Sequence, residues 1–239
     1  MVNLKTKGII LFIAGTALFS SSADARRVRE TGEIVAFNNV GIIGDIKETL
    51  EIWEEALKSA PDNVFIIHRI GSLYHKLGTE LLKGNTDLVF KAIGNFQKAR
   101  SWLKKAIAIN PDHPSFHYSL GVVERDLGNF DAAEKSFKKA IALDKDNIET
   151  GYILAVTYCD QQKLEEALAQ LNWIISIDPS HAPALFLRGT VKLMLLTNNK
   201  LTEIEAESGV DDLKLAIRLS PRLREELPAE LVEIFIEDE

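Results

Sequence analysis

"GNFDAAEKSFKKAIALDKDN", residues 128–147, nearly repeats a stretch that lies 34 residues upstream, "GNFQKARSWLKKAIAINPDH", residues 94–113. Ten of the twenty positions are identical. A third copy, "QKLEEALAQLNWIISIDPSH", occupies residues 162–181, again 34 residues further on. Periods of about 20–50 residues are typical of proteins built from stacked repeats. The sequence therefore predicts an array of similar units rather than one compact domain.

Each copy carries the spacing of an amphipathic helix, and a second helix precedes it. In residues 128–147 one helical face is formed by Phe130, Ala133, Phe137 and Ala140, which recur at steps of three and four. The preceding segment repeats this spacing with Phe116, Leu120, Val123 and Leu127. The predicted unit is helix, short turn, helix, and such a unit must stack on neighbours to bury its apolar face.

These residues resemble the tetratricopeptide repeat (TPR) family, whose pattern is W-x2-L-G-x2-Y, then A-x3-F and a closing Pro. One match reads Gly151-x2-Leu154-Ala155-x2-Tyr158, followed by Ala167-x3-Leu171 and Pro179. Two departures are that every first helix lacks the tryptophan and that Lys145 replaces one closing proline. The resemblance implies an all-α fold, a right-handed α-solenoid of stacked helix-turn-helix (TPR-like) repeats.

The repeat register predicts the domain organisation. The solenoid covers residues 44–222, with a half-unit (44–63) and four units (64–113, 114–147, 148–181 and 182–222). Measured between closing prolines, the first full unit (Pro61 to Pro111) exceeds the 34-residue period by 16 residues and the last (Pro179 to Pro221) by 8. We expect the larger insertion to lengthen both helices by about two turns, which makes a tall hairpin. Residues 26–43 are interpreted as a linker or a degenerate helix, and residues 223–239 as a capping helix with an acidic tail.

Small residues at one place in each first helix indicate close helix crossings. Gly71, Gly121, Ala155 and Gly189 occupy this place. Helix axes approach to about 8–10 Å only where the side chains between them are small. We expect these residues to face the repeated alanines of the second helices, which are Ala99, Ala133 and Ala167.

The N-terminus has the features of a secretory signal peptide over residues 1–25. Lys5 and Lys7 precede the uncharged stretch 8–22, "GIILFIAGTALFSSS", and the small-residue motif Ala23-Asp24-Ala25 follows. This predicts a periplasmic or extracellular protein after cleavage. The alternative is a membrane anchor formed by residues 8–22, because Arg26, Arg27 and Arg29 follow at once and positive charge tends to stay cytoplasmic.

Composition and motifs argue against several functional classes. The formal net charge is −7, and no basic run is long enough to follow a phosphate backbone, which excludes nucleic acid as an expected partner. Cys159 is the single cysteine, and catalytic, metal-binding and cofactor motifs are absent from the sequence. We expect no enzymatic activity, cofactor or metal. A weaker alternative is a hydrolase or metal protein that uses His68, His75 and nearby carboxylates.

The family resemblance implies that the first helices line a concave ligand groove. One inward-facing place per unit gives His68, Tyr118, Tyr152 and Phe186, and the place one turn later gives Ser72, Val122, Val156 and Thr190. Arg125 is a nearby basic residue on the same surface. Such a ladder suits an apolar or amphipathic peptide. The alternative interpretation is that these rings only cover neighbouring helices.

The same positions decide which partner the groove can take. Family members with a carboxylate clamp bind the acidic tails of cytosolic chaperones with Lys and Asn at the places held here by His68 and Ser72. The clamp is therefore absent. The sequence predicts a non-enzymatic adaptor that binds a peptide segment of a partner protein. The alternative is an architectural subunit of an envelope or membrane assembly, held by its convex face, the tall hairpin or the C-terminal helix.

Overall fold

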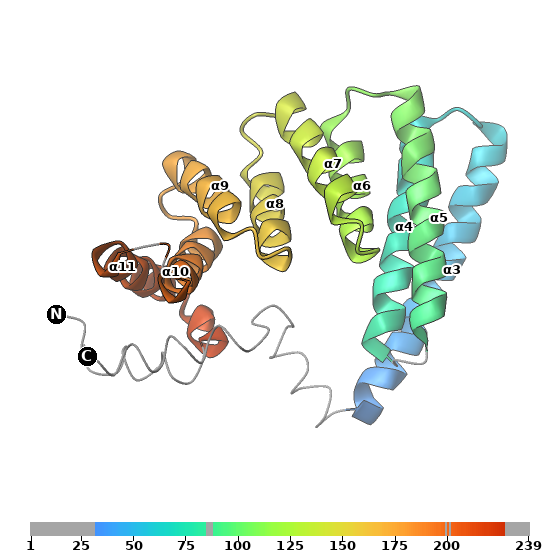
Figure 1. Cartoon of the computed structure of the whole chain (residues 1–239). Coiled ribbons are helices and arrows are strands. Elements are labelled where there is room, and N and C mark those ends of the chain that lie inside the picture. Colours follow the sequence, from blue (N-terminus) through green and yellow to red (C-terminus); the bar gives the residue numbers. More distant parts are fainter. Residues whose placement is uncertain (1–31, 85–87, 199, 201, 228–239) are drawn as a thin grey trace. The chain divides into compact units, whose positions relative to one another are not determined.

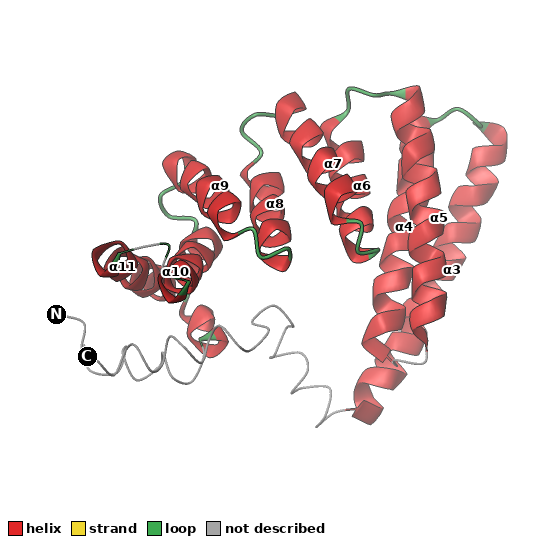
Figure 2. Cartoon of the chain, in the orientation of Figure 1, coloured by secondary structure: helices red, strands yellow, loops and turns green. Residues whose placement is uncertain are grey.

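The computed structural model describes residues 32–84, 88–198, 200 and 202–227, and within these ranges it contains helices and turns but no strand (Figure 2). The Cα positions divide into two compact units, which we call the N-terminal unit (Val28–Thr150) and the C-terminal unit (from Gly151 onward). None of the described helices combines the length and the apolar character that crossing a membrane requires. Each unit is described separately below.

The N-terminal unit is a row of antiparallel helices in which neighbours in the sequence pack side by side (Figure 1). Its helices are α3 (Gly32–Ser59), α4 (Val64–Gly84), α5 (Val89–Ile109), α6 (Pro114–Asp126) and α7 (Phe130–Leu143). The pairs α4–α5 and α6–α7 are the two helical hairpins, and α3 packs on α4 from the other side.

The C-terminal unit continues the alternation of first and second helices. It contains α8 (Ile148–Asp160, of which the first three residues belong to the N-terminal unit), α9 (Leu164–Ile177), α10 (Ala182–Thr197) and α11 (Glu203–Leu219). A 3₁₀ helix, η2 (Pro221–Glu226), follows α11 and packs on it. The capping helix expected beyond Pro228 lies outside the described residues.

Residues 32–43 are helical rather than a linker, because α3 is one continuous helix of 28 residues. Gly41 and Gly44 suggest a break, since each glycine costs a helix about 1 kcal/mol relative to alanine. Tertiary packing overrides this preference: Ile46 and Leu50 are buried against Ile70 and Leu77 of α4, with Ile43 packed beside them. Helical stability in proteins comes mostly from such packing.

The first insertion forms a tall hairpin, as expected. Helices α4 and α5 have 21 residues each, whereas α6 has 13 and α7 has 14. Both helices of this hairpin therefore gain about two turns. The second insertion has the smaller effect expected of it, because α10 and α11 have 16 and 17 residues against 13 and 14 in α8 and α9.

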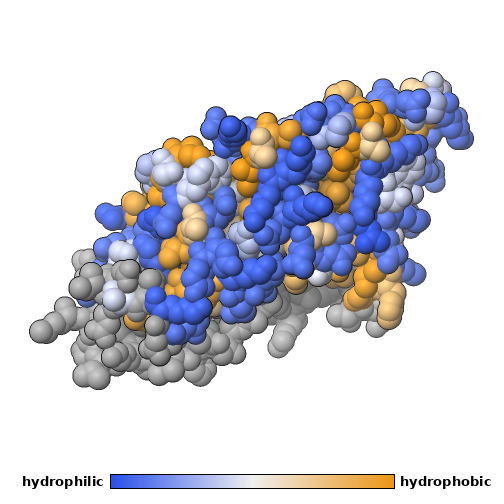
Figure 3. All heavy atoms as spheres, turned by 45° about the horizontal axis from the view of Figure 1, so that its top comes forward, coloured by the Kyte–Doolittle hydropathy of each residue, from blue (hydrophilic) through white to orange (hydrophobic). Residues whose placement is uncertain are grey.

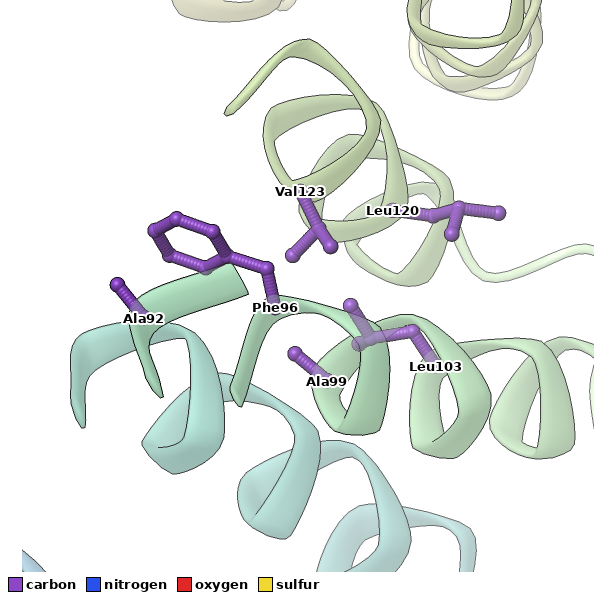
Figure 4. Close-up of a cluster of buried hydrophobic side chains, with 6 residues drawn as sticks. All are labelled: Ala92, Phe96, Ala99, Leu103, Leu120 and Val123. Carbon is purple, nitrogen blue, oxygen red and sulfur yellow. The ribbon is translucent and has the colours of Figure 1, made fainter. Parts of the chain in front are cut away.

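The core of the N-terminal unit lies where the hairpins meet. Helix α5 contributes Ala92, Phe96, Ala99 and Leu103, which pack against Leu120 and Val123 of α6 (Figure 4). All six are at most 9% exposed. The alternation of large and small side chains follows the repeat pattern, so the residues that identify the repeat also fill its core.

Gly71 and Gly121 of the first helices face large side chains, not the repeated alanines. A methyl group on Gly121 would lie 2.6 Å from ring carbons of Phe137, and one on Gly71 would lie 3.0 Å from Leu103. Leu103 and Phe137 follow the repeated alanines by four residues, one helical turn. The crossing is thus a glycine against a bulky residue, and the alanines are buried beside it.

Candidate functional site

We use the term first-helix face for the partly exposed side chains predicted to line a groove. In the N-terminal unit these are His68, Ser72, Tyr118, Val122 and Arg125, on α4 and α6. In the C-terminal unit they are Tyr152, Val156, Phe186 and Thr190, on α8 and α10. Every one of the nine is neither fully buried nor fully exposed. Each unit therefore presents part of the predicted set at its surface.

Two hydrogen bonds join α4 to α6 across this face. His68 Nε2 lies 2.9 Å from Ser119 Oγ, and His75 Nε2 lies 2.7 Å from Asp126 Oδ2. Both pairs are separated by 51 residues in the sequence. His68 and His75 are seven residues apart, about two helical turns, so they lie on the same side of α4. The two bonds fix the alignment of the neighbouring first helices.

His68 lies in an aromatic cluster at the start of the two helices. Its ring centre is 4.8 Å from that of Phe116, and the Phe116 ring also stacks on His113 at 4.2 Å. Phe65 packs edge-on against both His113 and Phe116 and is 64% exposed. Burial lowers the pKa of His68, and the neighbouring His113 and Arg69 lower it further. His68 is therefore neutral at pH 7.

Ser72 is not free to bind a ligand strongly, because its hydroxyl already donates to the backbone oxygen of His68, 3.1 Å away. Thr190 does the same on α10, where Oγ1 donates to the backbone oxygen of Phe186 at 3.0 Å. Such bonds to the residue four positions earlier are common for Ser and Thr within helices. Because their hydroxyl groups already donate these bonds, the two side chains contribute mainly to the shape of the face and less to hydrogen bonding with a ligand.

Tyr118 and Arg125 give the face its aromatic and cationic character in the N-terminal unit. The Tyr118 ring lies 6.2 Å from Phe137. Burial raises the pKa of Tyr118, the Glu149 carboxylate adds to this rise, and Arg125 opposes it. The hydroxyl therefore stays protonated. Arg125 Nη2 is 3.6 Å from Asp126 Oδ1, and Asp126 also binds His75.

In the C-terminal unit, the face is more apolar. The Tyr152 ring lies 5.7 Å from the His181 ring at the start of α10. Val156 and Phe186 are partly exposed on α8 and α10. Cys159, further along α8, is buried, and burial raises the pKa of its thiol to about 12. A thiol in this state is a packed core group.

Periodicity missed the groups that hold the face together. Ser119 and Asp126 each follow a predicted face residue by one position, and His75 occupies the place that corresponds to Arg125. Their sequence signal is a polar residue next to an apolar repeat position, which is common on any helix surface. Within the described part of the chain, no cluster of three or more metal-ligating side chains occurs.

A separate groove of about 710 Å³ lies between α3, α4 and α5. Its apolar lining includes Leu50, Leu77, Leu81 and Leu88. Tyr74 donates a hydrogen bond to Glu54 Oε1 at 2.8 Å, and the ammonium group of Lys98 lies 5.1 Å from the centre of the Tyr74 ring. Burial, followed by the Glu54 contact, raises the pKa of Tyr74 to about 12. This groove does not include first-helix face residues.

Family models of the tetratricopeptide repeat match residues 88–148 and residues 124–187. Residues 88–187 of the chain therefore consist of tetratricopeptide repeats. No curated protein matches the sequence significantly. The described helices and this match together establish an all-α solenoid fold of helix-turn-helix repeats.

Solved structures support the same fold. MamA is 21% identical with a TM-score of 0.59, and the match covers 75% of this chain and 91% of MamA. YrrB, a TPR protein with an unusual peptide-binding site, is 17% identical with a TM-score of 0.55, over 91% of this chain and 98% of YrrB. TTC0263, a thermophilic TPR protein of Thermus thermophilus, is 26% identical with a TM-score of 0.52, over 73% and 88% of the two chains.

Proposed function

We propose that this TPR protein is a non-enzymatic scaffold that binds a peptide segment of a partner protein on its first-helix face. The observation that carries the proposal is a set of partly exposed side chains at equivalent positions of successive repeats. Three of these repeats carry an aromatic ring at the same position: Tyr118, Tyr152 and Phe186. Aromatic side chains supply large contact areas with little loss of conformational entropy, and they are enriched where binding energy is concentrated. The peptide-binding site of YrrB supports this use of the fold.

The chemistry of the face defines the peptide. Tyr118 offers a protonated hydroxyl and a ring, Arg125 offers a cation, and Val122 lies between them on α6. Tyr152, Val156 and Phe186 offer mostly apolar surface. The ligand that fits is an amphipathic segment with apolar side chains and a hydrogen-bond acceptor or carboxylate. The chain lacks the lysine and asparagine of a chaperone-tail clamp, so a chaperone C-terminus is not the proposed ligand.

We also propose that the protein acts outside the cytosol or at a membrane. The support is the basic start, the uncharged stretch 8–22 and the small-residue motif that follows. The mass of the N-terminal peptide from purified native protein distinguishes cleavage near Ala25 from an anchor retained as residues 8–22. An intact N-terminus in a water-soluble cell fraction contradicts both forms of the proposal.

The test of peptide binding is a double substitution, Tyr118→Ala with Tyr152→Ala. Partners are first captured from the membrane and envelope fraction and identified by mass spectrometry. Peptides that tile an identified partner are then titrated by fluorescence anisotropy. The double variant should lose affinity at least tenfold, about 1.4 kcal/mol, because two ring contacts are removed.

The matched control is Ile52→Ala, which removes an apolar side chain on α3 that is 62% exposed and lies outside the first-helix face. This variant should bind the peptide as the unmodified protein does. Equal affinities for all three proteins overturn the first-helix face as the binding site. Circular dichroism confirms that each variant keeps its helical content.

The groove between α3, α4 and α5 favours a second candidate, an architectural subunit held at a surface outside the first-helix face. Its apolar lining and its volume of about 710 Å³ fit an apolar side-chain cluster of another subunit. The same capture experiment separates the two candidates. A partner that the double variant retains binds outside the first-helix face and supports the architectural role.

A further inference from the structure

The tip of the α4–α5 hairpin extends past the hairpin that follows it. Helices α4 and α5 are seven or eight residues longer than α6 and α7, which corresponds to about 10–12 Å of helix at 1.5 Å per residue. In a repeat stack each hairpin covers apolar surface of its neighbour. The additional turns of α4 and α5 therefore have no counterpart in α6 and α7 to cover them (Figure 1).

Four apolar side chains are exposed within two turns of this tip. Phe90 is 87% exposed, Leu82 is 45%, and Val89 and Ile93 are each 36% exposed. Phe90 lies on another side of α5 from the buried core residues Ala92 and Phe96. Val89 precedes Phe96 by seven residues, so it continues the core-facing side of α5 toward the end of the hairpin. We call the four exposed side chains the hairpin tip. Hydrophobic surface is visible at the lower right of Figure 3, where Figure 1 places this end of the unit.

Among the described residues of these two helix ends, the exposed charged side chains belong to two lysines. The Glu80 side chain is nearly buried and is neutralised by Lys83, whose Nζ lies 3.0 Å from Glu80 Oε1. Lys83 itself remains 62% exposed, and Lys91 is exposed on the first turn of α5. Lysines beside exposed apolar groups are suited to a membrane surface, since the stem lies along the apolar region while the ammonium group stays at the headgroups.

The sequence that precedes α3 contains the uncharged stretch 8–22, followed by a charged segment with Arg26, Arg27 and Arg29. Helix α3 begins at Gly32 at the same end of the unit as the C-terminal end of α4 (Figure 1). Further along α3, Lys47 lines one groove with Leu88, which directly precedes α5, and with Lys91 of α5. Residues 34–44 contain no charged side chain, and the uncharged stretch 8–22 lies further upstream. Apolar sequence and exposed apolar surface therefore meet at one end of the N-terminal unit.

We propose that the hairpin tip inserts into the headgroup and upper acyl region of a lipid bilayer, with Phe90 and Leu82 as its apolar contacts. This inference rests on the membrane-associated form of the proposed function. Interfacial segments bury their apolar face about 5–10 Å into the bilayer without crossing it, a depth that two helical turns can reach. The insertion in the first repeat unit then serves to hold the array at a membrane, while the first-helix face remains available to a peptide.

The test uses the full chain, made by cell-free synthesis with vesicles of phosphatidylcholine and phosphatidylglycerol so that residues 1–25 are retained. Phe90→Cys is labelled with an environment-sensitive fluorophore; Cys159 is buried and should not react. The matched control is Phe65→Cys, because Phe65 is 64% exposed at the opposite end of α4. We expect a blue shift, a several-fold rise in emission and quenching by shallow nitroxide lipids at position 90, and none of these at position 65.

Three other outcomes are possible, and each contradicts the inference for a different reason. A chain that floats with vesicles while the label at position 90 keeps its aqueous emission is held by its N-terminus alone. A label that responds only after envelope proteins are added shows a protein partner at the tip instead of lipid. A chain that does not float contradicts the membrane-associated form itself. Peptide affinity measured on the same sample tests the first-helix face independently of all three.

Discussion

At the residue scale, packing decides which residue types can occupy the positions that identify the repeat. Gly121 meets the ring of Phe137, which is fully buried, so the ring has little room to move. Gly94 is also helical, yet a methyl group added there would meet no atom within 4 Å. Two glycines in helices of the same unit thus experience opposite constraints, and the sequence alone does not distinguish them.

This contrast gives a matched pair of substitutions. Alanine raises helix propensity by about the same amount at both positions, about 1 kcal/mol. Gly94→Ala should therefore stabilise the protein, whereas Gly121→Ala must displace Phe137, and overpacking typically costs about 1–3 kcal/mol. The free energies of unfolding in urea should differ by about that amount between the variants. Equal stabilities contradict the glycine-against-phenylalanine crossing.

The His68 side chain makes stability depend on pH. Its pKa is lowered in the folded state, first by burial and then by His113 and Arg69, so the fold favours the neutral ring. The stabilisation that the neutral ring gives to the fold is fully present above the pKa of His68 in the unfolded chain, about 6.5. It is lost as the pH falls through the lower pKa of His68 in the folded protein. Unfolding free energies measured at about pH 7.5 and 5.5 should show a loss at the lower pH.

The control for this prediction is His68→Gln, which keeps a polar group beside Ser119 but does not titrate. The variant should lose less stability between the two pH values than the unmodified protein. An identical pH dependence in both proteins assigns the effect to other groups and contradicts the role given to His68.

At the element scale, the repeat period predicted which segments are helices. Tertiary contacts decided where a helix begins when the local sequence left this open. The helices α5 to α9 follow from apolar steps of three and four, because the residues that face the core are the ones that repeat. The start of α3 was ambiguous, since Gly41 and Gly44 disfavour a helix locally and only contacts such as Ile46 with α4 reverse that preference. Local sequence cannot reveal such contacts.

Helices α10 and α11 are joined by a nearly buried ionic cluster. Asp212 accepts hydrogen bonds from Arg188 Nε at 2.8 Å, from Arg188 Nη2 at 2.6 Å and from Lys192 Nζ at 2.8 Å. The three side chains are between 10% and 18% exposed. Removing one partner from such a cluster leaves the others desolvated without compensation, which is the costly case for buried charge.

Asp212→Ala should therefore lower the free energy of unfolding by about 3–5 kcal/mol. The matched control is Glu165→Ala, which breaks the solvent-exposed ion pair with Lys200 and should change stability little because water screens exposed pairs. Thermal and urea unfolding of both variants provide the measurement. A loss for Asp212→Ala no larger than for Glu165→Ala contradicts the structural role of the cluster.

At the scale of the whole molecule, the sequence predicted the fold class, whereas the binding role of the first-helix face stays a prediction and the interactions within the face were not predicted. Periodicity selects Tyr118, Tyr152 and Phe186 because equivalent places recur every 34 residues. The bonds from His68 to Ser119 and from His75 to Asp126 join residues 51 apart, and Phe90 is 87% exposed although it lies in an apolar segment. Both features require the three-dimensional arrangement.

The measurement that tests the central claim most directly is hydrogen–deuterium exchange of the full chain, with and without the peptide identified by capture. Bound peptide should slow exchange in α4, α6, α8 and α10, the helices that carry the first-helix face, and leave α5, α7, α9 and α11 unchanged. Slower exchange confined to α3 and α5, or no change in any first helix, contradicts peptide binding on this face.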